Sequence, residues 1–246
     1  MHEDESLVRR ARDHHNHGRR NPHFRQHSKT HSNPIWSRDG RTIYYRDDTL
    51  GPPDIYRWTL GEDHGTLIYQ GSGVEQPEDV SPDGKWMLFV SYNRPASSDV
   101  WLMPLNPPGP AKPLIATPFN EWFPRFSPDG KWIAYQSDVS GRAEVYLRAF
   151  EGSGLTMRIS KDGGTRPRWR ADCKELFFLA SDGKFMSVAI HGGVPVGVPR
   201  TLFQSRNAVD FEPAADGARF LVQIEDQPLD PPVHLLINWP ARLKSN

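Results

Sequence analysis

Apolar and polar positions along this chain alternate in short blocks. Runs of bulky apolar residues follow polar corners, as in WMLFV (86–90), WIAY (132–135) and ELFFL (175–179). Runs that are apolar almost throughout are typical of strands covered on both faces. Two further strand-like segments follow each run, for example DVWLMPL and then AKPLIAT. Because Pro and Gly also interrupt the chain at short intervals, the pattern predicts many short β-strands rather than long helices.

The polar corners recur at a nearly constant spacing. Aligned segments read WSRDGRTIYY, VSPDGKWMLF, FSPDGKWIAY, WRADCKELFF and PAADGARFLV, with the corner aspartate at Asp39, Asp83, Asp129, Asp172 and Asp216. The intervals are 44, 46, 43 and 44 residues. A period of about 40–45 residues is that of a four-stranded propeller blade, whereas helical ankyrin and tetratricopeptide repeats are shorter. The sequence therefore predicts an all-β fold, a β-propeller of four-stranded blades with about five repeats.

The corner itself has the chemistry of a tight turn. In Ser-Pro-Asp-Gly, proline presets the first central φ, aspartate bonds its own backbone, and glycine accepts the positive φ that follows. Four corners have glycine at this last place, and the fourth corner along the chain has Cys173 instead. No base stands near Cys173 in the sequence, so it is not expected to be a nucleophile. We predict that Cys173 occupies a strained glycine position.

The two ends of the chain depart from the repeat. The fifth unit supplies only three strand-like segments, NAVDFEP, ARFLVQI and VHLLINW, which allows an incomplete six-bladed ring. Residues 1–32 contain seven of the ten histidines and seven Lys or Arg against four acids, with few apolar side chains. Such a composition cannot form a core. We expect a disordered His/Arg-rich segment at 1–32 and a propeller at 33–246.

Charge and cysteine content narrow the class of protein. The chain has 30 basic and 30 acidic residues, so its formal net charge is zero. No global field then attracts nucleic acid or an anionic membrane. A single cysteine excludes an internal disulfide. No window approaches the ~18 apolar residues of a membrane span, and no signal peptide is recognisable. As written, the chain is expected not to be exported, and the cellular compartment and oligomeric state stay open.

The Ser-Pro-Asp-Gly corner, followed by an aromatic strand and an Ile-Tyr or Val-Tyr strand, resembles the repeat of TolB-type propellers, a WD-like family. The Gly-His and Trp-Asp signatures of true WD repeats are absent. The later units and the ending HLLINWPARLKSN also resemble the closing blades of propellers attached to bacterial serine/threonine kinases. The resemblance covers residues 33–246. It implies a periplasmic protein-binding role for TolB relatives and a sensing domain for kinase relatives. We expect the chain to be a C-terminal fragment of a longer protein or a shortened open reading frame.

Motifs of catalysis are missing from the sequence. It lacks G-x-S-x-G, H-E-x-x-H, G-x-x-x-x-G-K-[ST] and the kinase loops H-R-D and D-F-G. His14, His15 and His17 have no spacing that fixes a metal geometry, and one carboxylate per corner is too few for calcium. The sequence predicts no enzyme, no cofactor and no metal. The alternative is a propeller hydrolase or lyase, or the gating domain of a peptidase encoded elsewhere.

Loops opposite the Ser-Pro-Asp-Gly corners form the candidate binding face. It is expected to contain five residues: Glu121, Trp122, Arg125, Arg166 and Arg168. Arg125 and Arg168 stand four residues before their corner aspartates, so they should project near one another beside the central channel. Arginine pairs carboxylates bidentately, and Trp122 offers an apolar anchor. The predicted partner is an acidic protein or peptide, with internal pairing of the arginines as the alternative.

Aromatic side chains precede several corners. Trp36, Phe126 and Trp169 occupy the same place in three repeats, three residues before the corner aspartate. A sugar-binding platform is conceivable, but large aromatic side chains more commonly stabilise cores. We expect these three side chains to pack between blades.

Overall fold

The computed structural model describes residues 31–48, 52–93, 97–152, 154–225 and 233–236. These residues form strands β1 to β19 in five antiparallel sheets. The predicted His/Arg-rich segment lies outside the described residues except for His31 and Ser32, which begin β1. A search of the described residues finds no helix with the length and apolar character that crossing a membrane requires.

Each sheet consists of consecutive strands in their order along the chain. The first has β1 (His31–Trp36), β2 (Thr42–Asp47), β3 (Asp54–Thr59) and β4 (Thr66–Tyr69). The second has β5 (Val74–Val80), β6 (Trp86–Asn93), β7 (Ser97–Pro104) and β8 (Lys112–Ile115). The third has β9 (Glu121–Phe126), β10 (Trp132–Ser137), β11 (Glu144–Ala149) and β12 (Thr156–Arg158). The fourth has β13 (Thr165–Trp169), β14 (Glu175–Leu179), β15 (Lys184–His191) and β16 (Val194–Gln204). The fifth has β17 (Ala208–Pro213), β18 (Phe220–Ile224) and β19 (Val233–Leu236).

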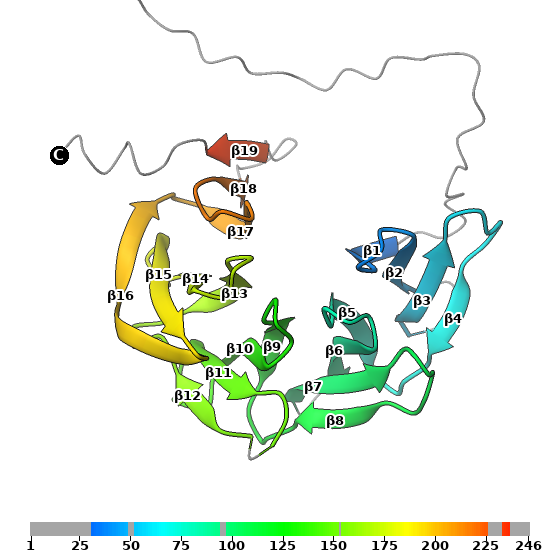
Figure 1. Ribbon diagram of the computed structural model, residues 1–246. Coiled ribbons are helices and arrows are strands. Elements are labelled where there is room, and N and C mark those ends of the chain that lie inside the picture. Colours follow the sequence, from blue (N-terminus) through cyan, green and yellow to red (C-terminus); the bar gives the residue numbers. More distant parts are fainter. Residues whose placement is uncertain (1–30, 49–51, 94–96, 153, 226–232, 237–246) are drawn as a thin grey trace, which may run out of the picture.

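The five sheets follow one another along an arc around a common axis (Figure 1). The first strand of each sheet lies toward the axis, and the fourth strand, where one is described, lies at the outside (Figure 1). The β1–β4 sheet and the β17–β19 sheet are the two ends of the arc. The predicted all-β propeller is confirmed, including the three strands of the fifth unit among the described residues.

The corner between the first two strands of each sheet is held by its aspartate. In the second sheet, Ser81 Oγ donates to Asp83 Oδ1 at 2.6 Å, and the same oxygen accepts the Lys85 N–H at 3.1 Å. The equivalent carboxylate-to-backbone bonds in the other four corners measure 3.0, 3.2, 3.0 and 2.9 Å. The local turn chemistry read from the sequence therefore forms in all five repeats.

Cys173 has the left-handed backbone conformation that was predicted. Its φ is 61°, against 66°, 71°, 73° and 69° for the glycines at the other corners, Gly40, Gly84, Gly130 and Gly217. Burial raises the pKa of the Cys173 thiol, which disfavours the reactive thiolate. The residue is a strained substitute for glycine.

The core lies between successive sheets. One position of the second strand, six residues after the corner aspartate, packs against the preceding sheet in four repeats, as Phe89, Tyr135, Phe178 and Val222. The equivalent residue of the first sheet is Tyr45, which clusters with Tyr56 and Trp58 of its own sheet among the described residues. Packing on both faces explains why β10 and β14 are almost entirely buried and why their sequences are apolar throughout.

Candidate functional site

The innermost strands surround a cavity of about 730 Å³ on the axis of the propeller. Its wall includes Pro82, Pro128, Ala171 and Ala215, each of which directly precedes a corner aspartate. The cavity therefore lies toward the corner side of the molecule. All five sheets contribute to it, because it is lined from β1, β5, β9, β13 and β17.

Arg125 lines this cavity from β9 and pairs with the preceding sheet. Its Nη1 donates to Glu78 Oε2 at 2.7 Å and to the Glu78 carbonyl oxygen at 2.6 Å. Burial lowers the pKa of Arg125, but the charges of Glu78 and Asp79 outweigh it, so the pKa lies above its ordinary value. The guanidinium group is held in place by acids of the second sheet.

Arg168 lines the same cavity from β13 and pairs with the following sheet. Nε donates to Glu212 Oε2 at 3.0 Å, and Nη2 donates to Asp210 Oδ1 at 2.9 Å. The residue is only 6% exposed. Burial and the neighbouring charge of Arg125 lower the pKa of Arg168. The structure thus brings Arg125 and Arg168 together in the cavity, each already paired with an acid.

Arg166 lies next to this pair. Its Nη1 donates to Asp210 Oδ2 at 2.7 Å, and its guanidinium group lies 4.4 Å from the ring centre of Phe123. Asn33, Phe123 and Arg166 are equivalent in three repeats and have φ values of 53°, 52° and 53°. A non-glycine residue in this region costs about 1–2 kcal/mol. The ladder register shifts at each of these places, so the inner strands bulge beside the channel.

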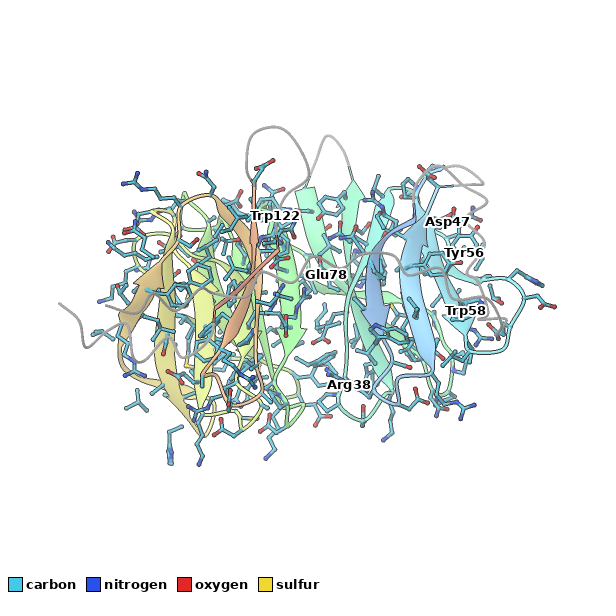
Figure 2. All side chains as sticks on the ribbon, turned by 90° about the horizontal axis from the view of Figure 1, so that it is seen from above. Arg38, Asp47, Tyr56, Trp58, Glu78 and Trp122 are labelled. Atoms are coloured by element: carbon cyan, nitrogen blue, oxygen red, sulfur yellow. The ribbon has the colours of Figure 1, made fainter. Side chains whose placement is uncertain are left out.

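Glu121 and Trp122 lie elsewhere. Glu121 is 1% exposed, and its Oε1 accepts hydrogen bonds from Thr117 Oγ1 at 2.6 Å and Ser137 Oγ at 3.3 Å. Burial raises the pKa of Glu121. Figure 2 shows Trp122 toward one face of the propeller and Arg38 toward the opposite face, with Glu78 between them. The five residues expected on one face therefore do not share one surface, because Glu121 is internal and Arg125 and Arg168 line a cavity on the corner side.

Trp36 and Arg38 also line the cavity, although neither was among the five predicted binding residues. Trp36 is 56% exposed, so the expectation that it packs between blades is wrong. Its equivalents follow that expectation. Phe126 is buried, and the Trp169 indole N–H donates to the Arg125 carbonyl oxygen of the preceding sheet at 3.4 Å. Trp36 differs because its sheet begins the described arc.

Arg38 stands where the second and third corners have proline, which was the available sequence signal. Its Nη2 donates to the Val80 carbonyl oxygen at 2.6 Å and to Asp79 Oδ1 at 3.2 Å. These bonds cross from the first sheet to the second. Arg38 thus contributes both to the cavity wall and to cohesion between sheets.

The residue types along the cavity wall limit the chemistry that they can perform. The described lining contains charged groups, aromatic rings and prolines but neither Ser, Cys nor His. It therefore offers no Ser–His or Cys–His pair for nucleophilic catalysis. Nor do the described residues bring together three or more potential metal ligands of the His, Cys, Asp and Glu types. His14, His15 and His17 lie outside the described residues.

No family model matches the chain. The chain is 26% identical over 159 residues to an uncharacterised protein of Agrobacterium fabrum, covering 58% of this chain and 53% of that protein. It is 27% identical over 164 residues to the Tol-Pal system protein TolB of Francisella tularensis, covering 63% of this chain and 36% of TolB. The chain thus spans about a third to a half of these relatives.

Solved structures show the same fold. The crystal structure of TolB from Acinetobacter baumannii superimposes with a TM-score of 0.69 at 21% identity, covering 85% of this chain and 52% of that one. A puromycin-hydrolysing peptidase of Mycobacterium tuberculosis gives a TM-score of 0.63 at 14% identity, covering 85% of this chain and 36% of the peptidase. The resemblance of the closing blades to kinase-attached propellers stays a prediction. In repeat sequence and in fold, the chain is a TolB-like β-propeller.

Proposed function

We propose that this chain is a non-catalytic propeller that binds a protein or peptide over the cavity on its axis. The observation that supports this proposal most directly is the composition of the cavity, whose described lining has an exposed tryptophan and charged side chains but no Ser, Cys or His. The similarity to TolB supports the same class of function, since the TolB resemblance implies protein binding.

Three accessible groups at the cavity are available to a partner. Trp36 is more than half exposed, and the side chains of Arg38 and Glu212 are 48% and 68% exposed. Exposed Trp and Arg are the residue types enriched at binding hot spots. Binding there can desolvate the indole ring while the charged groups fix the orientation of the partner.

An acidic partner is the finer part of the proposal. A carboxylate that enters the cavity takes the place of Glu212 on Arg168 Nε, because Glu212 is the more exposed member of that pair. Arg125 is less available, because Glu78 is almost fully buried against it. Exchange of one carboxylate for another predicts modest affinity from this contact and a clear dependence on salt.

The test is affinity capture from a lysate of the native organism, after circular dichroism has shown that every variant is folded. Trp36→Ala should lose partners that the wild-type protein retains. Val139→Ala is the matched control, since Val139 is also an exposed apolar residue but does not line the cavity. Recovery of the same partners by the wild-type protein and Trp36→Ala would exclude the cavity as the binding site. Glu212→Ala should strengthen capture of an acidic partner.

Gating of a peptidase is the second candidate function. The fold similarity to the peptidase of M. tuberculosis favours it, as does the position of the cavity on the propeller axis. In that case the captured partner should be a serine hydrolase that reacts with a fluorophosphonate probe. Captured partners without such reactivity would count against gating and leave the binding proposal standing.

A further inference from the structure

Two buried glutamates occupy equivalent places in the second and third sheets. Glu75 and Glu121 each stand eight residues before their corner aspartate, and each is 1% exposed. Glu75 Oε1 accepts a hydrogen bond from Ser91 Oγ at 3.1 Å, and Glu121 Oε1 accepts one from Ser137 Oγ at 3.3 Å. The other carboxyl oxygen, Oε2, is buried in both residues and has no hydrogen-bond partner among the described residues. Because the same arrangement occurs in two sheets, it reflects the place of this residue in the repeat.

Among the residues that the structure describes, the groups that act on the two carboxyls are uncharged or acidic. Asp54 of β3 acts on Glu75, and Asp99 of β7 acts on Glu121, each from the third strand of the preceding sheet. The other groups near Glu75 are the Ser91 hydroxyl, the Gly73 backbone N–H and the Tyr69 phenol. The other groups near Glu121 are the hydroxyls of Thr117 and Ser137 and the Tyr135 phenol. A second negative charge beside each group disfavours its ionised form.

Two other buried glutamates of the propeller have a different environment. Glu144 Oε1 accepts from Arg142 Nε at 2.8 Å, and Glu175 Oε2 accepts from Arg170 Nη1 at 2.9 Å. Guanidinium groups therefore balance the charge of both. An ionised Glu75 would instead be a buried negative charge with one oxygen unpaired, an arrangement that is costly unless the group is neutralised.

We propose that Glu75 and Glu121 are neutral carboxylic acids in the folded protein, and that they make the cohesion of the first three sheets depend on pH. Glu75 lies where the second sheet meets the first, and Glu121 lies where the third meets the second. The first sheet ends the arc (Figure 1), so it is the part that loosens when these groups lose their protons.

The direction of the pKa shift decides whether the stability of the fold rises or falls with pH. Burial raises the pKa of both groups above the ordinary 4.5, so the folded chain holds protons that the unfolded chain has released. Stability is then greatest at and below about the ordinary pKa and falls as the pH rises through the raised one. Each proton changes the unfolding equilibrium constant by up to about tenfold per pH unit in that window.

Infrared spectroscopy in D2O at about pH 6 provides the test, because exposed carboxyl groups are ionised there. The wild-type protein should show the C=O stretch of protonated carboxyl groups. Glu75→Gln and Glu121→Gln should each remove part of this band, and the double variant should remove both parts. Glu151→Gln, at an exposed position, is the control and should change nothing. A wild-type spectrum without the band, or a band unchanged in the double variant, would overturn the proposal.

Urea denaturation between about pH 5 and pH 8 is a second measurement. The wild-type protein should lose stability over this range more steeply than the double glutamine variant does, because the variant has no proton to release at these two sites. If stability falls equally steeply with pH in the wild-type protein and in the double variant, the proposal is also overturned. If either variant fails to fold, the wild-type band and its disappearance as the pH is raised still decide the question.

Discussion

Replacement of Cys173 by glycine should stabilise the propeller. Cys173 has a φ of 61°, a conformation that glycine adopts at four equivalent corners. A side chain in this left-handed region costs about 1–2 kcal/mol. Glycine removes that strain but makes the unfolded chain more flexible, which costs about 0.5–1 kcal/mol. At the midpoints of these ranges, the net gain in the free energy of unfolding is about 0.75 kcal/mol.

The magnitude can be measured by urea denaturation and by calorimetry. For a chain of this size, about 1 kcal/mol corresponds to about 2–4 °C in melting temperature. Cys173→Gly should raise the melting temperature by about 1–4 °C under reducing conditions. It should leave partner capture unchanged, because Cys173 does not line the central cavity.

Gly84→Cys is the matched reverse change. Gly84 has a φ of 71°, and no atom lies within 4 Å of the Cβ that cysteine would add, so only the backbone opposes the substitution. It should lower the free energy of unfolding by about the amount that Cys173→Gly raises it. A lower melting temperature for Cys173→Gly, or an unchanged one for Gly84→Cys, would refute the strain argument.

Three further predictions concern the core, the ion pairs and the tyrosines. Phe89→Ala should cost about 3–5 kcal/mol because the ring is fully buried, whereas Leu221→Ala, at a 44% exposed side chain, should cost under about 1 kcal/mol in the same urea experiment. Arg168→Leu should lower the free energy of unfolding by about 2–3 kcal/mol. Arg38 is more exposed, so Arg38→Ala should lower it by under about 1 kcal/mol, and comparable losses for the two variants would contradict this ranking. Burial raises the pKa of Tyr45, Tyr92 and Tyr135 to about 12. The free energy of unfolding should therefore fall as the pH rises from 10 to 12, and ultraviolet titration should show these phenols ionising only as the fold is lost.

Much of the fold could be predicted because the turn and strand signals of each repeat lie close together in the sequence. The corner hydrogen bonds join residues two apart, as between Ser81 and Asp83, so the sequence alone identifies them. The left-handed Cys173 follows from alignment with the corner glycines. Continuous apolar runs indicated strands covered on both faces, and such coverage repeated at a fixed period requires stacked sheets.

The candidate site could be predicted only in part. Equivalent positions in adjacent repeats correctly suggested that Arg125 and Arg168 lie near each other, since a repeat fixes the angular place of a residue. Their partners are 47 and 44 residues away, in neighbouring sheets, and no local rule pairs Arg125 with Glu78 or Arg168 with Glu212. The inward direction of Glu121 likewise depends on how strands of adjacent sheets meet.

The sequence by itself determined the period, the turn chemistry and the class of fold, because these depend on contacts between residues that are close along the chain. The tertiary structure decided which charges are neutralised, which carboxyl groups are buried without a cation and which aromatic side chain stays exposed. Trp36 shows the difference clearly. Its type and position match those of Trp169, but exposure depends on whether a preceding sheet is present to cover the ring, and only the arrangement of the sheets in space determines that.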